Sequence, residues 1–222
     1  MPVISEHYSG ERGLTYLSHR QRAASPVSAA IDIEYFKPYL TQTDRVLDFG
    51  CGTGGIVGEL ARIVGRADGL EVNQASADLA RKTGCTIFDR LEQLPEAPMY
   101  DVIVTNHCLE HVRDVCTTLE ILRCHLRKGG LLIAKLPIDD FRHPHQRRYA
   151  SNDIDHHLST WTPRLFANVL FESGYSVLEC RVLTQAWHSI VFPFARTKVA
   201  KSIFWLVAVL LKRRQLFAVA QA

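Results

Sequence analysis

Residues 46–55, with the sequence VLDFGCGTGG, constrain the fold more than any other part of the chain. A short apolar run ends in a glycine-rich stretch, which is typical of a buried parallel strand that breaks into a tight turn and then a helix. Glycine is needed there because the backbone must reach positive φ and a ligand must approach it closely. The amides at the start of the helix then face the ligand. The segment therefore predicts a ligand-binding turn between a strand and a helix.

Two ligand classes fit this turn. Gly50-x-Gly52-x-x-Gly55 matches the dinucleotide fingerprint, and Glu71 lies at the offset of an acid that binds a ribose hydroxyl. Asp48, however, stands two residues before the first glycine. A carboxylate at the strand end favours a cationic ligand and repels a pyrophosphate, so a nicotinamide enzyme is the weaker alternative. S-adenosylmethionine carries an ammonium and a sulfonium, and with Asp48 the segment resembles the class I S-adenosylmethionine-dependent methyltransferases.

Later segments extend this resemblance. Residues 100–114, YDVIVTNHCLEHVRD, are similar to the fourth-strand motif of ubiquinone-biosynthesis-type and related small-molecule methyltransferases. The L-x-K-G-G turn at 126–130 and the T-P segment that begins at Thr162 are two further marks of these families. The resemblance implies transfer of a methyl group from S-adenosylmethionine to a small-molecule acceptor.

Strand and helix patterns alternate after Arg45, which favours an α/β fold with a parallel sheet. Strands are predicted at 67–72, 86–88, 100–105, 131–135, 175–183 and 215–220, and helices at 55–64, 74–83, 119–126, 164–173 and 199–211. The resemblance implies a Rossmann-like, doubly wound, seven-stranded sheet of order 3-2-1-4-5-7-6, with strand 7 antiparallel and helices on both faces. We expect one domain over 1–222, with a helical lead or lid at 1–40, a cofactor-binding core at 45–136 and the acceptor side at 137–222.

The resemblance also implies which residues hold the cofactor. Glu71 follows the second strand, and its two oxygens can accept both ribose hydroxyls. Asp89 and the backbone amide of Arg90 take the place of the adenine contacts. The predicted cofactor residues are Asp48, Gly50, Cys51, Gly52, Gly54, Glu71, Val72, Asp89, Arg90, Asn106 and His107. In the lead, Tyr16, Arg20 and Arg22 are weaker candidates for ligand contact.

Methyl transfer to a hydroxyl requires a base near the transition state, and histidine suits neutral pH. His107 and His111 follow the fourth strand, where the methyl group should point. Because four residues separate them, one helical turn would bring both to the same side. A purely structural role for His111 is the alternative.

The segment 138–160 is rich in His and Asp and follows the fifth strand, where this fold commonly covers the acceptor pocket. His157 is the third candidate for catalysis. His156 and His157 with Asp153 and Asp155 fit no standard ligand spacing, so no metal site is predicted. The nearby arginines are Arg142, Arg147 and Arg148. They either bind a phosphate or carboxylate of the acceptor or form a plain charged surface.

Residues 198–214 combine an apolar, Trp-bearing run at 203–211 with basic residues at both ends. The run of nine residues is short of the about 20 that span a bilayer. We favour packing in the core for this helix. A dimer surface and peripheral contact with an anionic membrane stay open, and the membrane interpretation would make a lipid-linked acceptor plausible.

Bulk properties restrict the remaining function classes. A net charge of +3 and the lack of an N-P-P-[YF] motif after the fourth strand speak against a nucleic-acid substrate. The scattered cysteines and a polar N-terminus without an apolar stretch predict a cytoplasmic chain. We expect in-line methyl transfer to a hydroxyl oxygen, with a lipid-linked or macromolecular acceptor, or a non-catalytic cofactor-binding subunit, as alternatives. The acceptor, the methylated atom and the oligomeric state stay open.

Overall fold

A computed structural model describes residues 6–8, 10–20, 26–139, 144–184, 198–211 and 213–222. Its strands form one seven-stranded sheet of order β3-β2-β1-β4-β5-β7-β6. The strands are β1 Arg45–Phe49, β2 Arg66–Leu70, β3 Thr86–Phe88, β4 Tyr100–Asn106, β5 Leu126–Pro137, β6 Ser176–Leu183 and β7 Gln215–Gln221. The first five strands pair in parallel, whereas β7 runs antiparallel to β5 and β6. The predicted fold class and strand order are confirmed.

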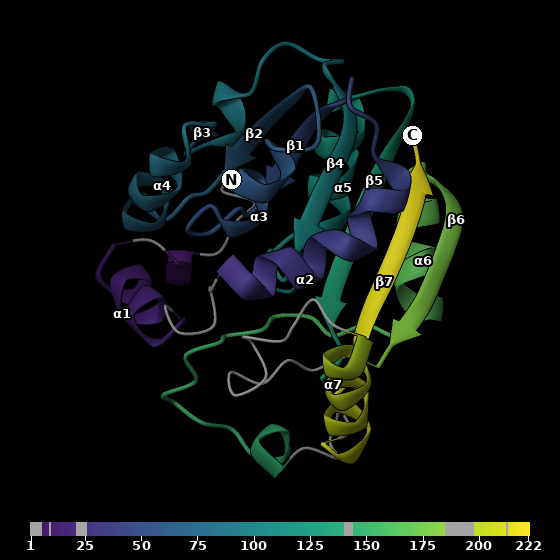
Figure 1. The fold of residues 1–222 in the computed structure, drawn as a ribbon. Coiled ribbons are helices and arrows are strands. Elements are labelled where there is room, and N and C mark those ends of the chain that lie inside the picture. Colours follow the sequence, from purple (N-terminus) through teal and green to yellow (C-terminus); the bar gives the residue numbers. More distant parts are fainter. Residues whose placement is uncertain (1–5, 9, 21–25, 140–143, 185–197, 212) are drawn as a thin grey trace.

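Helices cover both faces of this sheet (Figure 1). Helix α2 (Pro26–Phe36), α3 (Gly55–Leu60) and α4 (Gln74–Ala80) share one hydrophobic cluster with the sheet. Helices α5 (Val115–His125) and α6 (Pro163–Glu172) share the other. Buried strands with both faces covered are apolar almost throughout, which explains the continuous apolar runs in the sequence.

The strand register brings the predicted functional segments to one edge of the sheet. Asp48 in β1 pairs with Val104 in β4, and Phe49 pairs with Leu70, the last residue of β2. The glycine turn, Glu71 and the segment after β4 therefore leave neighbouring strands at the same edge. In a doubly wound sheet this edge is where ligands bind.

Some boundaries differ from the prediction, and local chemistry explains them. The helix predicted at 119–126 begins at Val115, because the Asp114 side chain caps it by accepting the N–H of Thr117 at 3.0 Å. Strand β5 begins at Leu126 and not at Leu131, since Leu126 already pairs with Tyr100 before the exposed residues 127–129 interrupt the ladder. Helix α3 ends at Leu60, four residues early, in a run of turns.

A buried ion pair joins α2 to the centre of the sheet. The ammonium of Lys135 in β5 donates to Asp32 of α2, and both side chains are buried. Asp32 also accepts from the amide of Asn106 at 3.4 Å, at the end of β4. This pair, which the sequence analysis did not anticipate, holds α2 across the edge where the ligand-binding segments meet.

Helix α7 (Lys198–Leu210) overturns the prediction of core packing for this segment. Trp205 is 57% exposed and Leu210 is 71% exposed, and of the described side chains in the helix Ala208 alone is buried. Figure 1 shows the reason, since α7 lies beyond the end of β7 and outside the layers that cover the sheet. Within the described ranges, no helix has the length and hydropathy needed to cross a membrane.

Candidate active site

A cavity of about 790 Å³ opens at the carboxyl edge of β1, β2 and β4. Its walls come from the glycine turn, the lead, the segment that follows β5, and Leu211 with residues 213–215. Ten of the predicted site residues line it: Asp48, Gly50, Cys51, Gly52, Glu71, Val72, Asn106, His107, His111 and His157. The edge of the sheet that the glycine motif predicted as a ligand site is therefore hollow.

The glycines of the turn have different structural roles. Gly50 has φ +77°, and a Cβ added there would lie 2.3 Å from the Cys108 sulfur, so close packing requires glycine. At Gly52, φ is +53° and no atom of the described residues lies within 4 Å of an added Cβ, so its backbone borders open space in the cavity. Gly54 caps α3 and packs against Ala80 of α4, away from the cavity lining.

The Glu71 carboxylate fastens the glycine turn to the end of β2. One oxygen accepts the N–H of Gly52 at 2.9 Å, and the other accepts the N–H of Asn73 at 2.7 Å. Burial raises the pKa of Glu71, while these backbone hydrogen bonds oppose the rise. Each carboxylate oxygen keeps a further lone pair, so the two amides do not use up its capacity to accept ribose hydroxyls.

Asp48 supplies the strongest sign of a cationic ligand. Its side chain is 1% exposed, and its Oδ2 atom has no hydrogen-bond partner among the described residues. Burial, with a smaller contribution from Glu71, raises the pKa of Asp48 to about 7. A buried carboxylate oxygen without a partner is costly, and a cation beside it would relieve that cost. These residues therefore fit S-adenosylmethionine.

Glu110 joins the two histidines that follow β4. The predicted helical turn from His107 to His111 is wrong, because His107 has φ +53° and the turn that follows is a short 3-10 helix, η5, over Leu109–His111. Instead, His107 Nδ1 and His111 Nε2 lie 3.6 Å and 3.7 Å from the same carboxylate oxygen of Glu110. Glu110 is not among the predicted site residues, although its place between two histidines in H-C-L-E-H was a usable signal.

The lead reaches the same cluster through Tyr8. The Tyr8 hydroxyl lies 2.5 Å from Nδ1 of His111 and donates to the carbonyl oxygen of Asp155. The single hydroxyl proton of Tyr8 is donated to Asp155, so the Tyr8 oxygen accepts a hydrogen bond from His111. His111 therefore carries its proton on Nδ1 and keeps a lone pair on Nε2. Burial lowers the pKa of His111 to about 4, so the ring is neutral at pH 7. Tyr16 also lines the cavity.

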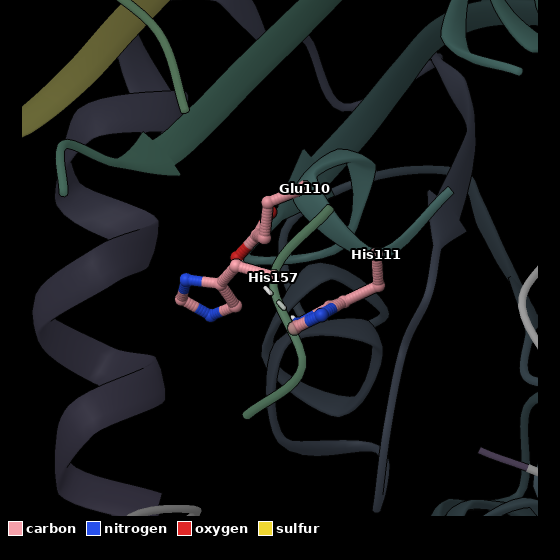
Figure 2. Close-up of side chains that lie close together, drawn as sticks. All are labelled: Glu110, His111 and His157. Atoms are coloured by element: carbon pink, nitrogen blue, oxygen red, sulfur yellow. Dashed lines mark ion pairs between the residues drawn. The ribbon is translucent and has the colours of Figure 1, made fainter. Parts of the chain in front are cut away.

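His157 approaches from the segment after β5 and is held by Asp139. The Asp139 carboxylate accepts from Nδ1 of His157. Burial alone would lower the pKa of His157, but Asp139 and the nearby Glu110 raise it above its ordinary value. Its neighbour His156 has φ +46° and stacks on His7 at 4.3 Å, so adjacent histidines take separate partners. Figure 2 shows Glu110, His111 and His157 converging from two segments.

Other candidates lie elsewhere. Asp89 and Arg90 follow β3 and pair with each other at 3.3 Å, outside the cavity lining. Arg147 and Arg148 are exposed and also lie outside the lining, whereas Arg213 and Arg214, which the sequence analysis had not chosen, belong to it. Arg22 and Arg142 fall outside the described residues, as does the side chain of Arg20.

Comparisons with known proteins identify the family of the chain. The family described as "Methyltransferase domain" matches residues 16–180. The ubiquinone biosynthesis O-methyltransferase of Methylocella silvestris is 32% identical over 98 residues, which are 40% of this chain and 38% of that protein. The chain thus spans well under two thirds of the length of that relative.

Solved structures show the same fold at low sequence identity. A methyltransferase of Thermotoga maritima, described as a possible histamine N-methyltransferase, has a TM-score of 0.66 and 15% identity, over 93% of this chain and 96% of that chain. Phosphoethanolamine N-methyltransferase 2 of Haemonchus contortus, in complex with S-adenosyl-L-methionine, has a TM-score of 0.62 and 12% identity, over 93% and 59%. With the family match, the sheet order and the glycine turn, the chain belongs to the class I S-adenosylmethionine-dependent methyltransferases.

Proposed function

We propose that the chain methylates a hydroxyl oxygen of a small-molecule acceptor. The observation that carries this proposal is that one cavity joins the glycine turn and Asp48 to the ionisable cluster of Glu110, His111 and His157. The bound cofactor supplies an electrophilic methyl group, and the chain supplies alignment and exclusion of water. An acceptor bound between the cofactor and the ionisable cluster would have the two things that O-methylation requires. These are an aligned methyl group and a nearby group that takes the proton.

The proposal gives each wall a separate task. Asp48 faces the positive charge of the cofactor, and Glu71 accepts from its ribose. Cys51, Val72 and the glycines shape the cradle, and Asn106 and His107 border the methyl group. Described residues of the lead, such as Tyr8 and Tyr16, form the lid, and described residues after β5, such as Asp139 and His157, supply the acceptor side.

We propose that an imidazole in the cavity accepts the proton of the acceptor hydroxyl, and His107 is the first candidate for this base. Its side chain is 36% exposed, against 11% for His111 and 18% for His157, so an acceptor reaches it most easily. His111 and His157, fixed by Tyr8 and Asp139, would hold the acceptor oxygen. The name of the Methylocella silvestris relative, an O-methyltransferase, supports oxygen as the methylated atom.

A lipid-linked acceptor is the second candidate, and exposed helix α7 favours it. Apolar side chains of the helix face solvent, and residues that directly follow it, Leu211, Arg213 and Arg214, line the cavity. An apolar helix next to basic side chains suits the surface of an anionic membrane. Sedimentation with anionic vesicles, compared with a Trp205→Asp variant and with zwitterionic vesicles, tests this contact. Equal sedimentation of both forms would contradict it.

Two measurements test the main proposal. Calorimetry should show binding of S-adenosylmethionine and S-adenosylhomocysteine but not NAD, and Glu71→Ala should weaken binding tenfold or more, because a charged hydrogen-bond partner contributes about 1.5–3 kcal/mol. Glu172→Ala, at an exposed position of α6, is the control. A screen of phenols, catechols, amines and carboxylic acids with labelled cofactor should then give a methyl ether by mass spectrometry. A product methylated only at nitrogen or carbon would overturn the assignment to oxygen.

A further inference from the structure

Glu110, His111 and His157 form a compact group of metal-ligand side chains in the cavity wall. One oxygen of Glu110 and one nitrogen of each imidazole all lie within 4.8 Å of one another. Ligands that share one ion at ordinary bond lengths are about 3–3.5 Å apart. Small rotations of the side chains would therefore bring all three atoms onto one ion.

The Glu110 carboxylate gives an independent reason to expect a cation. It is fully buried, and both of its oxygens lack a hydrogen-bond partner among the described residues. The neighbouring imidazole nitrogens stop at 3.6 Å and 3.7 Å, beyond hydrogen-bond distance. Leaving a buried carboxylate in this state is costly, and a bound cation would satisfy it.

One ring nitrogen of His111 and one of His157 already have a hydrogen-bond partner. Nδ1 of His111 donates to Tyr8, whose hydroxyl in turn donates to the Asp155 carbonyl. Nδ1 of His157 is held by the Asp139 carboxylate. Metal-binding histidines in proteins are oriented in this way, with one nitrogen on an oxygen partner and the other left for the ion. Both rings are thus prepared to bind through Nε2.

We propose that Glu110, His111 and His157 bind a divalent transition-metal ion such as Zn²⁺. Two imidazoles and one carboxylate suit such an ion, and three protein ligands leave a coordination position open, as in catalytic sites. All three residues line the cavity, so an ion that they hold would border it.

The role of the ion rests on the proposed function, whereas its binding does not. An acceptor hydroxyl on the ion becomes more acidic, and its proton passes to a ring nitrogen of His107, which is not a ligand. An oxygen lone pair then forms the bond to the methyl carbon while the carbon–sulfur bond breaks and its electron pair goes to sulfur. The products are the methyl ether, S-adenosylhomocysteine and protonated His107.

Metal binding is tested without cofactor or acceptor. The full chain is stripped with a chelator and titrated with Co²⁺, whose visible absorption reports imidazole and carboxylate ligation, and with Zn²⁺ by calorimetry. We expect one equivalent to bind, and Glu110→Gln and His157→Asn should each weaken binding tenfold or more. His156→Asn is the matched control, because this neighbouring ring stacks on His7 outside the cluster, and it should bind like the unchanged protein.

The results decide the metal site and its catalytic role separately. Absence of Co²⁺ and Zn²⁺ binding by the stripped protein would overturn it, and so would binding that neither Glu110→Gln nor His157→Asn weakens. The Asp139→Asn variant should still bind one equivalent of metal, but with lower affinity, since the change removes only the carboxylate that orients His157. Metal binding without any methyl transfer would contradict the proposed function and leave the metal site standing. Full methyl transfer by the metal-free protein would contradict the catalytic role of the ion.

Discussion

The hydroxyl of Tyr8 lies 2.5 Å from Nδ1 of His111, although 103 positions separate the two residues in the chain. The contact brings the N-terminal lead against the turn that follows β4. It closes one wall of the cavity and selects the tautomer of an imidazole that lines it.

Tyr8→Phe should lower turnover about tenfold and leave the affinity for S-adenosylhomocysteine within about twofold. The change keeps the ring packed on Tyr16 but removes the oxygen that orients His111, and a buried hydrogen bond of this kind contributes about 1.5 kcal/mol. Steady-state kinetics and calorimetry measure the two effects. Tyr149→Phe, at a fully exposed ring, is the control, and a Tyr8→Phe enzyme as active as this control would show that the contact is structural only.

Gly50→Ala should lower the stability of the protein, whereas Gly52→Ala should weaken ligand binding. At Gly50 the new Cβ would meet the Cys108 sulfur at 2.3 Å, so we expect a melting temperature several degrees lower. At Gly52 the Cβ enters open space, so the change costs only about 1 kcal/mol of backbone strain, but it blocks the approach of a ligand. Thermal unfolding and calorimetry separate the two effects. Equal loss of stability in both variants would contradict this assignment.

Affinity for S-adenosylmethionine should fall as the pH drops below about 7. Burial raises the pKa of Asp48 to about 7, so at lower pH the carboxyl is protonated and must release its proton before it can face a cation. The loss approaches tenfold per pH unit well below the pKa. Titrations between about pH 8 and about pH 6 measure the slope, which Asp48→Asn should flatten. An unchanged slope in that variant would place the titrating group elsewhere.

Lys135→Met should destabilise the fold by about 3–5 kcal/mol, because it leaves the Asp32 carboxylate buried without its partner. Urea unfolding measures the change in free energy. The double variant Asp32→Leu, Lys135→Met should recover much of the loss, since two apolar side chains can replace a buried ion pair. Lys128→Met, at an exposed position of β5, is the control. If Lys135→Met were as stable as the control, the pair would have no part in holding α2.

Local patterns were sufficient for the alternation of strands and helices and for the glycine turn at the cavity. The apolar run before Gly50 and the acid two residues ahead of it predicted both the turn and the charge of its ligand, because strand, turn and helix there depend on neighbours in sequence. The early start of α5 was also readable, since Asp114 precedes the amide of Thr117 that it caps by three residues. The glycine turn, Glu71 and the histidines after β4 all came to the predicted edge.

The sequence by itself thus determined the strand order, by resemblance, and the glycine turn with the acid before it, by local chemistry. Only the tertiary structure decided the acceptor side, where Tyr8 meets His111, Asp139 meets His157, and Glu110 is buried between imidazoles. It also decided that α7 stays exposed. The physical reason is that burial and pairing between residues far apart in the sequence depend on how helices and strands pack together. The spacing of residues along the chain does not specify that packing.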